Sequence, residues 1–254
     1  MPTPNTLHAV EMMGVRMNPL TMDETLVWIA DRIDAGTFTQ HTVVNVAKIV
    51  SMQADVRLRD AVLACDLVNI DGMGVVWGAR LMGIDVPERV AGIDIFVKLL
   101  HLAVERQWSV FLLGARKEVV QATAARIQQD LPRLRIAGSH HGYFWDNEEE
   151  VVDRIHASGA DLLFVAITSP RKEQFIDRWR ERLGVRFAMG VGGSFDVLAG
   201  KTRRAPTWMQ NYGLEWLFRM AQEPKRMARR YLVTNARFAW MLARARWRMS
   251  SGRG

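Results

Sequence analysis

Short runs of mostly apolar residues alternate along the first 200 positions with segments whose apolar residues recur every three or four places. The runs are typical of buried strands, and the recurring segments are typical of amphipathic helices. Strands that alternate with helices predict a mostly parallel sheet covered on both faces, so we expect a three-layer, Rossmann-like α/β fold. The runs that predict strands are Thr42–Val46, Cys65–Ile70, Ser109–Leu113, Leu134–Ser139, Asp161–Ile167 and Arg186–Val191.

Residues at segment boundaries place several of the helices. Thr21 and Glu24 have the spacing of a capping box and predict a helix start. A single helix is expected over Lys48–Ala64. Ser169, acting as a cap before Pro170, predicts the start of another helix.

The strand Cys65–Ile70 ends at a glycine turn that carries the most informative carboxylate of the chain. Asp71 is followed by Gly72 and Gly74, after which apolar residues resume at helical spacing. The carboxyl end of a parallel strand is where open α/β sheets bind ligands. Because glycines let the backbone approach a substrate closely, Asp71 could accept a proton there as a general base. The alternative is that Asp71 only caps the following helix.

Two further strand ends supply candidate residues. Asn45 stands near the end of its strand, where it could cap the next helix or join Asp71 if the two strands are neighbours. Gly114 turns another strand into a helix, and such a unit can hold a phosphate on the helix N-terminus. One glycine is weak support, and the chain has neither a G-x-G-x-x-G nor a P-loop motif.

Loops at later strand ends add aromatic, cationic and glycine positions. Tyr143 could offer a flat ring to a nucleotide base or pack beneath its loop. Lys172 projects from the first turn of a helix near the sheet edge, and Gly193 lies in the turn after the last strand. The adjacent His140 and His141 have no cysteine or carboxylate at ligand spacing, so we expect no metal site.

The composition is that of an ordinary soluble globular protein, with 49% hydrophobic and 24% charged residues among 254. The single cysteine, Cys65, excludes an intramolecular disulfide framework. No apolar stretch reaches the ~18 residues of a membrane span, and Met1–Asn18 lacks the pattern of a signal peptide. The sequence therefore predicts a cytoplasmic protein and indicates no cofactor.

Positive charge is concentrated at the C-terminal end of the chain. Residues 201–254 contain 13 Lys and Arg against 2 Glu, a net charge of +11, which leaves −4 for residues 1–200 and +7 for the whole. We expect an α/β domain over residues 1–200 and a basic helical appendage over residues 201–254. The acidic body argues against nucleic-acid binding, and the basic appendage predicts an anionic partner.

Two helices are expected in the appendage, one over Trp208–Met220 and one from Pro224 to about Met249. The second has an apolar stripe flanked by arginines, with Trp240 and Trp247 beyond them. A basic, tryptophan-bearing amphipathic helix suits an anionic membrane surface, and the alternative is that the stripe packs on the globule. The stripe consists of Tyr231, Phe238, Met241, Leu242 and Met249.

Ordered motifs run along most of the chain. They are Asp71-Gly72-Met73-Gly74, Glu88-Arg89-Val90-Ala91-Gly92, Gly142-Tyr143-Phe144, Gly192-Gly193-Ser194-Phe195-Asp196, Arg203-Arg204-Ala205-Pro206, Gly213-Leu214-Glu215-Trp216-Leu217-Phe218-Arg219 and Glu223-Pro224-Lys225-Arg226. On these motifs the chain resembles the WecG/TagA/CpsF family of bacterial glycosyltransferases from about Met12 to Arg230. The resemblance implies an inverting, metal-independent enzyme that takes a sugar from a UDP-sugar, often UDP-N-acetylmannosamine or its uronic acid, or a related hexose. The implied acceptor is a polyprenyl-diphosphate-linked sugar at the inner face of the membrane, in cell-surface polysaccharide or wall-polymer synthesis.

The resemblance also implies roles for individual residues. Asp71 matches the proposed general base, Asn45 a polar residue beside it, and Arg89 a residue of the same pocket. Tyr143 and Asp196 match positions that line the nucleotide pocket. The appendage matches one that docks on the membrane and closes the site, which implies a peripheral protein at the inner face. The resemblance leaves a homo-oligomer open.

Two positions depart from the family pattern. The family often has a threonine two residues before the asparagine, where this chain has Val43, with Thr42 one position earlier. The family often reads Pro-x-Gln-Glu, and here Lys172 stands in place of the glutamine. A cation at that position could meet a diphosphate or a uronic-acid donor.

The chain has no D-x-D spacing, the arrangement with which many sugar-nucleotide enzymes hold a divalent metal. Without a metal, cations and helix N-termini must stabilise the leaving UDP. Two other classes of protein stay open at this point, namely a sugar-nucleotide or dinucleotide oxidoreductase and a non-enzymatic membrane- or nucleic-acid-binding protein. The arginines available to a leaving diphosphate are Arg203, Arg204, Arg219 and Arg226 of the appendage.

Overall fold

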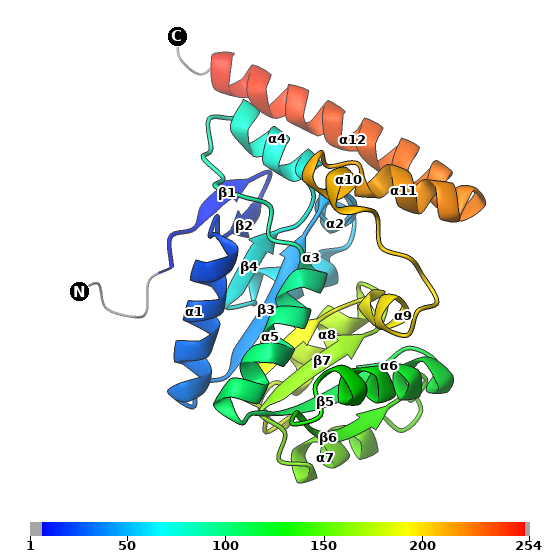
Figure 1. The fold of residues 1–254 in the computed structure, drawn as a ribbon. Helices are drawn as coiled ribbons and strands as arrows, with labels where there is room; N and C mark the ends of the chain where they lie inside the picture. Colours follow the sequence, from blue (N-terminus) through cyan, green and yellow to red (C-terminus); the bar gives the residue numbers. More distant parts are fainter. Residues whose placement is uncertain (1–6, 252–254) are drawn as a thin grey trace.

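The computed structural model describes residues 7–251, and the side chains in that range except those of residues 211, 225–230 and 249–251. Its centre is a six-stranded, wholly parallel sheet in the order β4-β3-β8-β7-β5-β6, with helices on both faces (Figure 1). The three-layer α/β fold expected from the sequence is confirmed. The strands are β3 (Thr39–Val44), β4 (Leu67–Ile70), β5 (Ser109–Gly114), β6 (Arg135–His140), β7 (Leu162–Ala166) and β8 (Phe187–Gly190).

The two faces of the sheet are covered by different sets of helices. One face carries α1 (Met22–Asp34), α5 (Gly92–Arg106), α6 (Lys117–Asp130) and α9 (Ser194–Leu198). The other carries α7 (Glu148–Ala157) and α8 (Arg171–Trp179), with α3 (Val56–Leu63) packed beside α8. Because the central strands are buried on both faces, they read in the sequence as continuous apolar runs.

The segment expected as one helix over Lys48–Ala64 forms two helices, α2 (Val46–Met52) and α3. The Asp55 side chain accepts a hydrogen bond from the backbone N–H of Leu58 at 3.0 Å and caps α3. A residue that caps a helix has extended backbone, so Asp55 interrupts the helical path.

An antiparallel hairpin covers the β4 edge of the sheet, and it was not predicted from the sequence. Its strands are β1 (Val10–Met12) and β2 (Val15–Met17). Met12, Val15 and Met17 are buried with residues of α2, α3 and α4 (Met73–Leu81) in a separate apolar cluster.

The C-terminal helices lie across the end of the molecule at which α4 is found (Figure 1). They are α10 (Thr207–Asn211), α11 (Glu215–Gln222) and α12 (Pro224–Ser251), so the single helix expected over Trp208–Met220 is wrong. The chain turns at Gly213, which has a φ of +72°. A Cβ at Gly213 would lie 2.4 Å from the Met73 side chain, so this turn needs glycine for its backbone angle and for its close contact with α4.

The apolar stripe of α12 packs on the α/β domain rather than facing outward for a membrane. Phe238 is only 6% exposed, and its ring would meet a Cβ built on Gly78 of α4 at 3.0 Å. Leu242 approaches the same glycine, and Met241 packs against the apolar cluster of α2 and α4. The expectation that these three side chains face a membrane is therefore wrong. Met249 has no described side chain.

Other apolar side chains remain exposed at this end of the molecule. On α12 they include Trp240 and Trp247, which are 62% and 69% exposed. Among the described residues, no helix is both long enough and apolar enough to cross a bilayer. The remaining exposed side chains of this kind are Trp77 and Leu81 on α4, Trp208 of α10, Tyr212 just after it, Trp216 and Leu217 on α11, and Leu232 and Val233 on α12.

A buried polar chain joins β3, β4 and α1. His41 Nε2 lies 2.9 Å from Asn69 Oδ1, and Asn69 Nδ2 donates to Thr25 Oγ1 at 2.9 Å. The pKa of His41 is lowered from 6.5 to about 4. Burial is the largest cause, and the positive charge of Lys48 also lowers the pKa, whereas the hydrogen bond with Asn69 raises it. His41 is therefore neutral in the folded protein over most of the physiological range.

This histidine predicts a loss of stability in mild acid. The unfolded chain binds the proton near pH 6.5 and the folded chain only near pH 4, so the free energy of unfolding falls as pH drops through that window. The expected loss is about 3 kcal/mol. Urea unfolding as a function of pH should show this slope in the wild type and lack it in His41→Gln. Equal slopes in the two proteins would contradict the assignment.

Candidate active site

Asp71 and Asn45 are brought together by neighbouring strands. β3 and β4 pair in parallel with Val44 opposite Ile70, and the N–H of Asp71 donates to the carbonyl of Val44 at 2.8 Å. Gly72, with a φ of +107°, then turns the chain into α4. A Cβ on Gly72 would lie 3.8 Å from the Cβ of Asn45, so the two candidate residues occupy one corner of the sheet edge.

Asn45 caps α2 through its side-chain oxygen, which accepts the N–H of Lys48 at 3.0 Å. The capping interpretation is therefore confirmed for this atom. Among the residues that the structure describes, the Asn45 amide nitrogen has no hydrogen-bond partner. That nitrogen is the atom that Asn45 can offer to a substrate beside Asp71.

The Asp71 carboxylate is held by a cation and a backbone N–H. Arg89 Nη1 lies 3.8 Å from Asp71 Oδ1, and the N–H of Gly92 lies 3.4 Å from Oδ2. The same Arg89 atom lies 3.1 Å from Oε2 of Glu215, on α11. Asp71 does not cap α4, whose first turn has no side-chain cap. The alternative in which it is only a helix cap is therefore excluded.

The surroundings of Asp71 raise its pKa above the ordinary 3.8. Burial is the largest cause; Arg89 opposes it, and the negative charge of Glu215 adds to it. The side chain still keeps 26% of its surface exposed. A carboxylate that is partly accessible and has a raised pKa is suited to taking a proton from a hydroxyl group.

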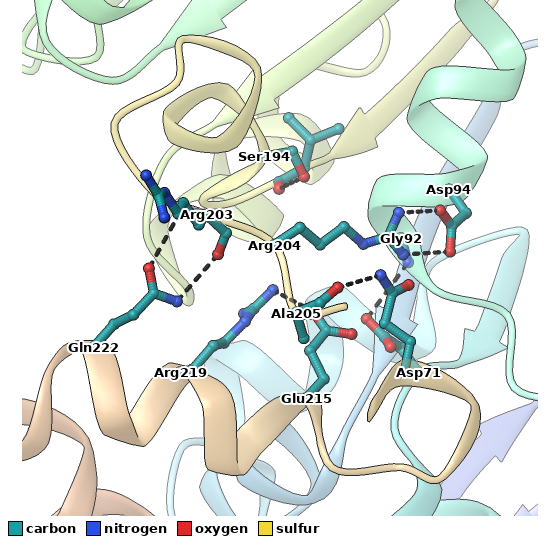
Figure 2. Close-up of polar contacts among 12 residues, drawn as sticks. Asp71, Gly92, Asp94, Ser194, Arg203, Arg204, Ala205, Glu215, Arg219 and Gln222 are labelled. Atoms are coloured by element: carbon teal, nitrogen blue, oxygen red, sulfur yellow. Dashed lines mark hydrogen bonds and ion pairs between the residues drawn. The ribbon is translucent and has the colours of Figure 1, made fainter. Parts of the chain in front are cut away.

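Two appendage arginines make ion pairs at this end of the sheet (Figure 2). Arg204 contacts both carboxylate oxygens of Asp94, in the first turn of α5, at 2.5 and 2.7 Å. Burial lowers the pKa of Arg204, but Asp94 raises it more. Arg219 donates to Glu215 at 2.9 Å. Glu215, which the sequence reasoning missed as a site residue, thereby links Arg219 to Arg89.

The other two appendage arginines are placed differently. Arg203 is tied through its backbone, whose N–H and carbonyl bond the Gln222 side chain at 3.2 and 3.1 Å (Figure 2). Its own side chain is exposed. The side chain of Arg226 lies outside the described residues.

A second group of candidates lies at the ends of β5 and β6. Gly114 has a φ of +124°, and a Cβ there would lie 2.5 Å from the carbonyl oxygen of Ala166. The N–H of Gly142 donates to the carbonyl of Ala115 at 2.8 Å and draws the next loop over β5. Tyr143, in that loop, is 68% exposed. Its ring is therefore not packed beneath the loop.

The turn after β8 leads through Gly193 into α9. The carbonyl of Asp196 accepts the N–H groups of Lys201 and Thr202 at 2.9 and 3.1 Å, which fixes the start of the appendage. α9 packs against α6, where Thr123 donates to the carbonyl of Phe195. Gly193 and Asp196 thus lie beside the helix that follows Gly114.

A buried charge cluster lies between these two groups of candidates. Lys48 Nζ is 2.9 Å from Glu173 Oε1, and Ser169 donates to Glu173 Oε2 at 2.9 Å. Burial raises the pKa of Glu173, but Lys48, Lys172 and these hydrogen bonds lower it to about 2. Ser169 does not cap α8, which begins at Arg171, so that expectation was wrong. The sequence did not indicate Lys48 as a residue of this cluster, because 125 positions separate it from Glu173.

Among the described residues, no three histidine, cysteine, aspartate or glutamate side chains gather as metal ligands. Nδ1 of His140 instead forms a hydrogen bond with the backbone carbonyl of His141 at 2.8 Å. The described carboxylates at this edge of the sheet form ion pairs with arginine or lysine side chains.

Comparisons with known proteins agree with one another. Residues 10–252 match the model of the glycosyl transferase WecG/TagA/CpsF family. An N-acetylglucosaminyldiphosphoundecaprenol N-acetyl-beta-D-mannosaminyltransferase of Bacillus spizizenii is 40% identical over 171 residues, which cover 67% of this chain and 66% of the relative. A protein of the same name from Bacillus subtilis is 36% identical over 170 residues, with the same coverage. The match therefore spans just under two thirds of each relative's length.

Proposed function

Because the chain belongs to the WecG/TagA/CpsF family of glycosyl transferases, we propose that it moves a sugar from a UDP-sugar to a polyprenyl-diphosphate-linked acceptor, with inversion and without a metal. Both relatives carry a name that specifies N-acetylmannosaminyl transfer to a diphosphoundecaprenol-linked N-acetylglucosamine. Those names support N-acetylmannosamine as the donor sugar, with its uronic acid or a related hexose as alternatives. Family membership also counts against an oxidoreductase or a non-enzymatic protein.

The observation that carries the proposal is the Asp71 carboxylate at the end of β4. The acceptor hydroxyl gives its proton to Asp71 while its oxygen bonds the anomeric carbon of the donor sugar. The bond from that carbon to the diphosphate breaks in the same step, and UDP leaves with the electron pair. A single displacement inverts the configuration and needs one base. Arg89 and the N–H of Gly92 orient the carboxylate for this step.

The leaving diphosphate gains one negative charge when its bond to the sugar breaks. In this proposal the appendage supplies the cations that stabilise that charge. Arg204 and Arg219 stand beside the site with Asp94 and Glu215 as partners, so a diphosphate would share these arginines with the carboxylates. Arg203 carries an exposed side chain on the same segment. Cations placed where charge develops stabilise the transition state rather than the bound substrate.

The appendage is also proposed to dock on an anionic membrane at the inner face. The support is its net charge of +11 together with exposed aromatic side chains such as Trp208, Trp240 and Trp247. The apolar acceptor lipid would be reached from that surface. Residues 1–200 would then form the catalytic domain and residues 201–254 the docking appendage.

A transfer assay in excess chelator tests the proposed reaction. We expect purified protein to release UDP and form the linked disaccharide in equal amounts from UDP-N-acetylmannosamine and a soluble N-acetylglucosaminyl-diphosphate-lipid analogue. EDTA should leave the rate unchanged, because the described residues offer no cluster of metal ligands. Activity that EDTA removes and Mg²⁺ restores would contradict the metal-free mechanism.

A further inference from the structure

One nitrogen of Arg89 contacts two carboxylates unequally. Its Nη1 donates a hydrogen bond to Oε2 of Glu215 at 3.1 Å, whereas Oδ1 of Asp71 lies 3.8 Å from the same atom. A separation of 3.8 Å is too long for a hydrogen bond, although the opposite charges still attract each other. Arg89 is therefore bonded to Glu215 and only attracted by Asp71.

Glu215 is itself fixed from two sides. Arg219 donates to its Oε1 at 2.9 Å, and Arg89 donates to its Oε2. The side chains of Arg89 and Glu215 are each 14% exposed, so salt in the solvent screens their charges little. Glu215 and Arg219 come from α11, whereas Asp71 follows β4 (Figure 2). The appendage thus brings a fixed carboxylate to the candidate base of the α/β domain.

An arginine that hydrogen-bonded Asp71 directly would make it a poorer base. It would occupy a lone pair that the acceptor hydroxyl needs, and a neighbouring arginine lowers the pKa of an aspartate by about 1–3. In the folded protein burial is the largest cause of the raised pKa of Asp71; Arg89 then lowers the pKa, Glu215 raises it and Arg219 lowers it. Glu215 therefore opposes the effect of Arg89.

The remaining charged groups on this side of the site are bound to each other. Arg204, from the segment before α10, forms a two-point ion pair with Asp94 of α5 at 2.5 and 2.7 Å. Arg204 interacts with Asp71 and Glu215 only through electrostatic attraction. Among the described residues, Arg89 is the cation that forms an ion pair with Asp71.

We infer that Glu215 is a positioning residue of the reaction, which holds the Arg89 guanidinium away from Asp71 and leaves that carboxylate free to take the acceptor proton. This inference rests on the proposed function, in which Asp71 is the base. Without Glu215, the guanidinium would turn to the nearest remaining carboxylate, Asp71. The appendage therefore contributes to catalysis through a carboxylate as well as through its arginines.

The test compares the pH dependence of kcat/KM in Glu215→Gln and in the wild type. Because the negative charge of Glu215 raises the pKa of Asp71, its removal should move the acidic limb about one pH unit lower. The weaker base should also lower kcat on the plateau about tenfold. Arg89→Gln should move the limb in the opposite direction, to higher pH. Glu215→Asp retains the charge and should fall between Glu215→Gln and the wild type.

Two further variants separate this role from simple anchoring of the appendage. Glu118→Gln is the matched control, because Glu118 of α6 pairs with Lys201 at 3.5 Å, where the appendage begins, and should leave the limb in place. In the Arg89→Gln background, Glu215→Gln should move the limb less than half as far as it does alone, since Glu215 acts through Arg89.

A carboxyl ¹³C NMR titration of Asp71 reads the same coupling without substrate. The Asp71 signal is identified by its loss in Asp71→Asn. Unchanged titration of Asp71 in Glu215→Gln, or a shift of equal size in the Arg89→Gln background, would overturn the inference. A protein in which Asp71 titrates as expected but which transfers no sugar would instead overturn the proposed function.

Discussion

Asp71→Asn is expected to lower kcat for sugar transfer by about 100-fold or more while UDP affinity stays close to that of the wild type. An amide has the shape of the carboxylate but cannot take the acceptor proton. Its oxygen can still accept the N–H of Gly92, and Arg89 keeps Glu215 as a partner at 3.1 Å. The measurement is single-turnover transfer together with UDP titration.

The matched control for this variant is Asp85→Asn, since Asp85 is an exposed carboxylate in the loop after α4. It should retain wild-type turnover and stability. Thermal unfolding of Asp71→Asn establishes that the variant is folded. A folded Asp71→Asn protein with wild-type turnover would remove Asp71 from the mechanism.

Ending the chain after Lys201 should abolish both transfer and vesicle binding. The cut removes Arg204, Arg219 and Glu215 from the site, and all of α12 from the surface of α2 and α4. Each Lys or Arg near an anionic surface contributes about 1 kcal/mol, so binding by the intact chain should weaken in salt. Sedimentation with anionic and neutral vesicles measures this loss. Full transfer by the shortened chain would contradict a catalytic role for the appendage.

A shorter cut separates anchoring from catalysis. Ending the chain after Glu223 keeps α10 and α11 and removes only α12. This protein should lose vesicle binding and still act on a soluble acceptor analogue. Since removing α12 also uncovers the Gly78 face of α4, point variants supply a control for stability. Trp240→Ala should weaken vesicle binding with little change in stability, whereas Phe238→Ala should destabilise the packing of α12.

The sheet and the Asp71 turn could be predicted because local pattern determines them. A buried parallel strand needs an apolar run, and Gly72 and Gly74 mark its end. The family resemblance rests on motifs that keep their order along the chain. It is confirmed by the match of residues 10–252 to the family model. Gly213 carried a signal for the break between α10 and α11, and the expected helix ran through it.

Contacts between distant segments could not be read from the sequence. Arg204 and Asp94 are 110 residues apart, and Arg89 and Glu215 are 126 residues apart. The stripe on α12 has the same spacing whether it meets a membrane or a protein surface, so the sequence could not decide that Phe238 packs on Gly78. Only the fold places Lys172 and Lys48 on one carboxylate.

The pH dependence of kcat/KM tests the role of Asp71 most directly. A base must be deprotonated to act, so activity should fall as pH decreases through an apparent pKa above the ordinary 3.8 of an aspartate, because burial raises the pKa of Asp71. Arg89 lowers that pKa, so Arg89→Gln should move the acidic limb to higher pH. A profile without an acidic limb in this range, or a limb that stays in place in Arg89→Gln, would contradict Asp71 as the general base.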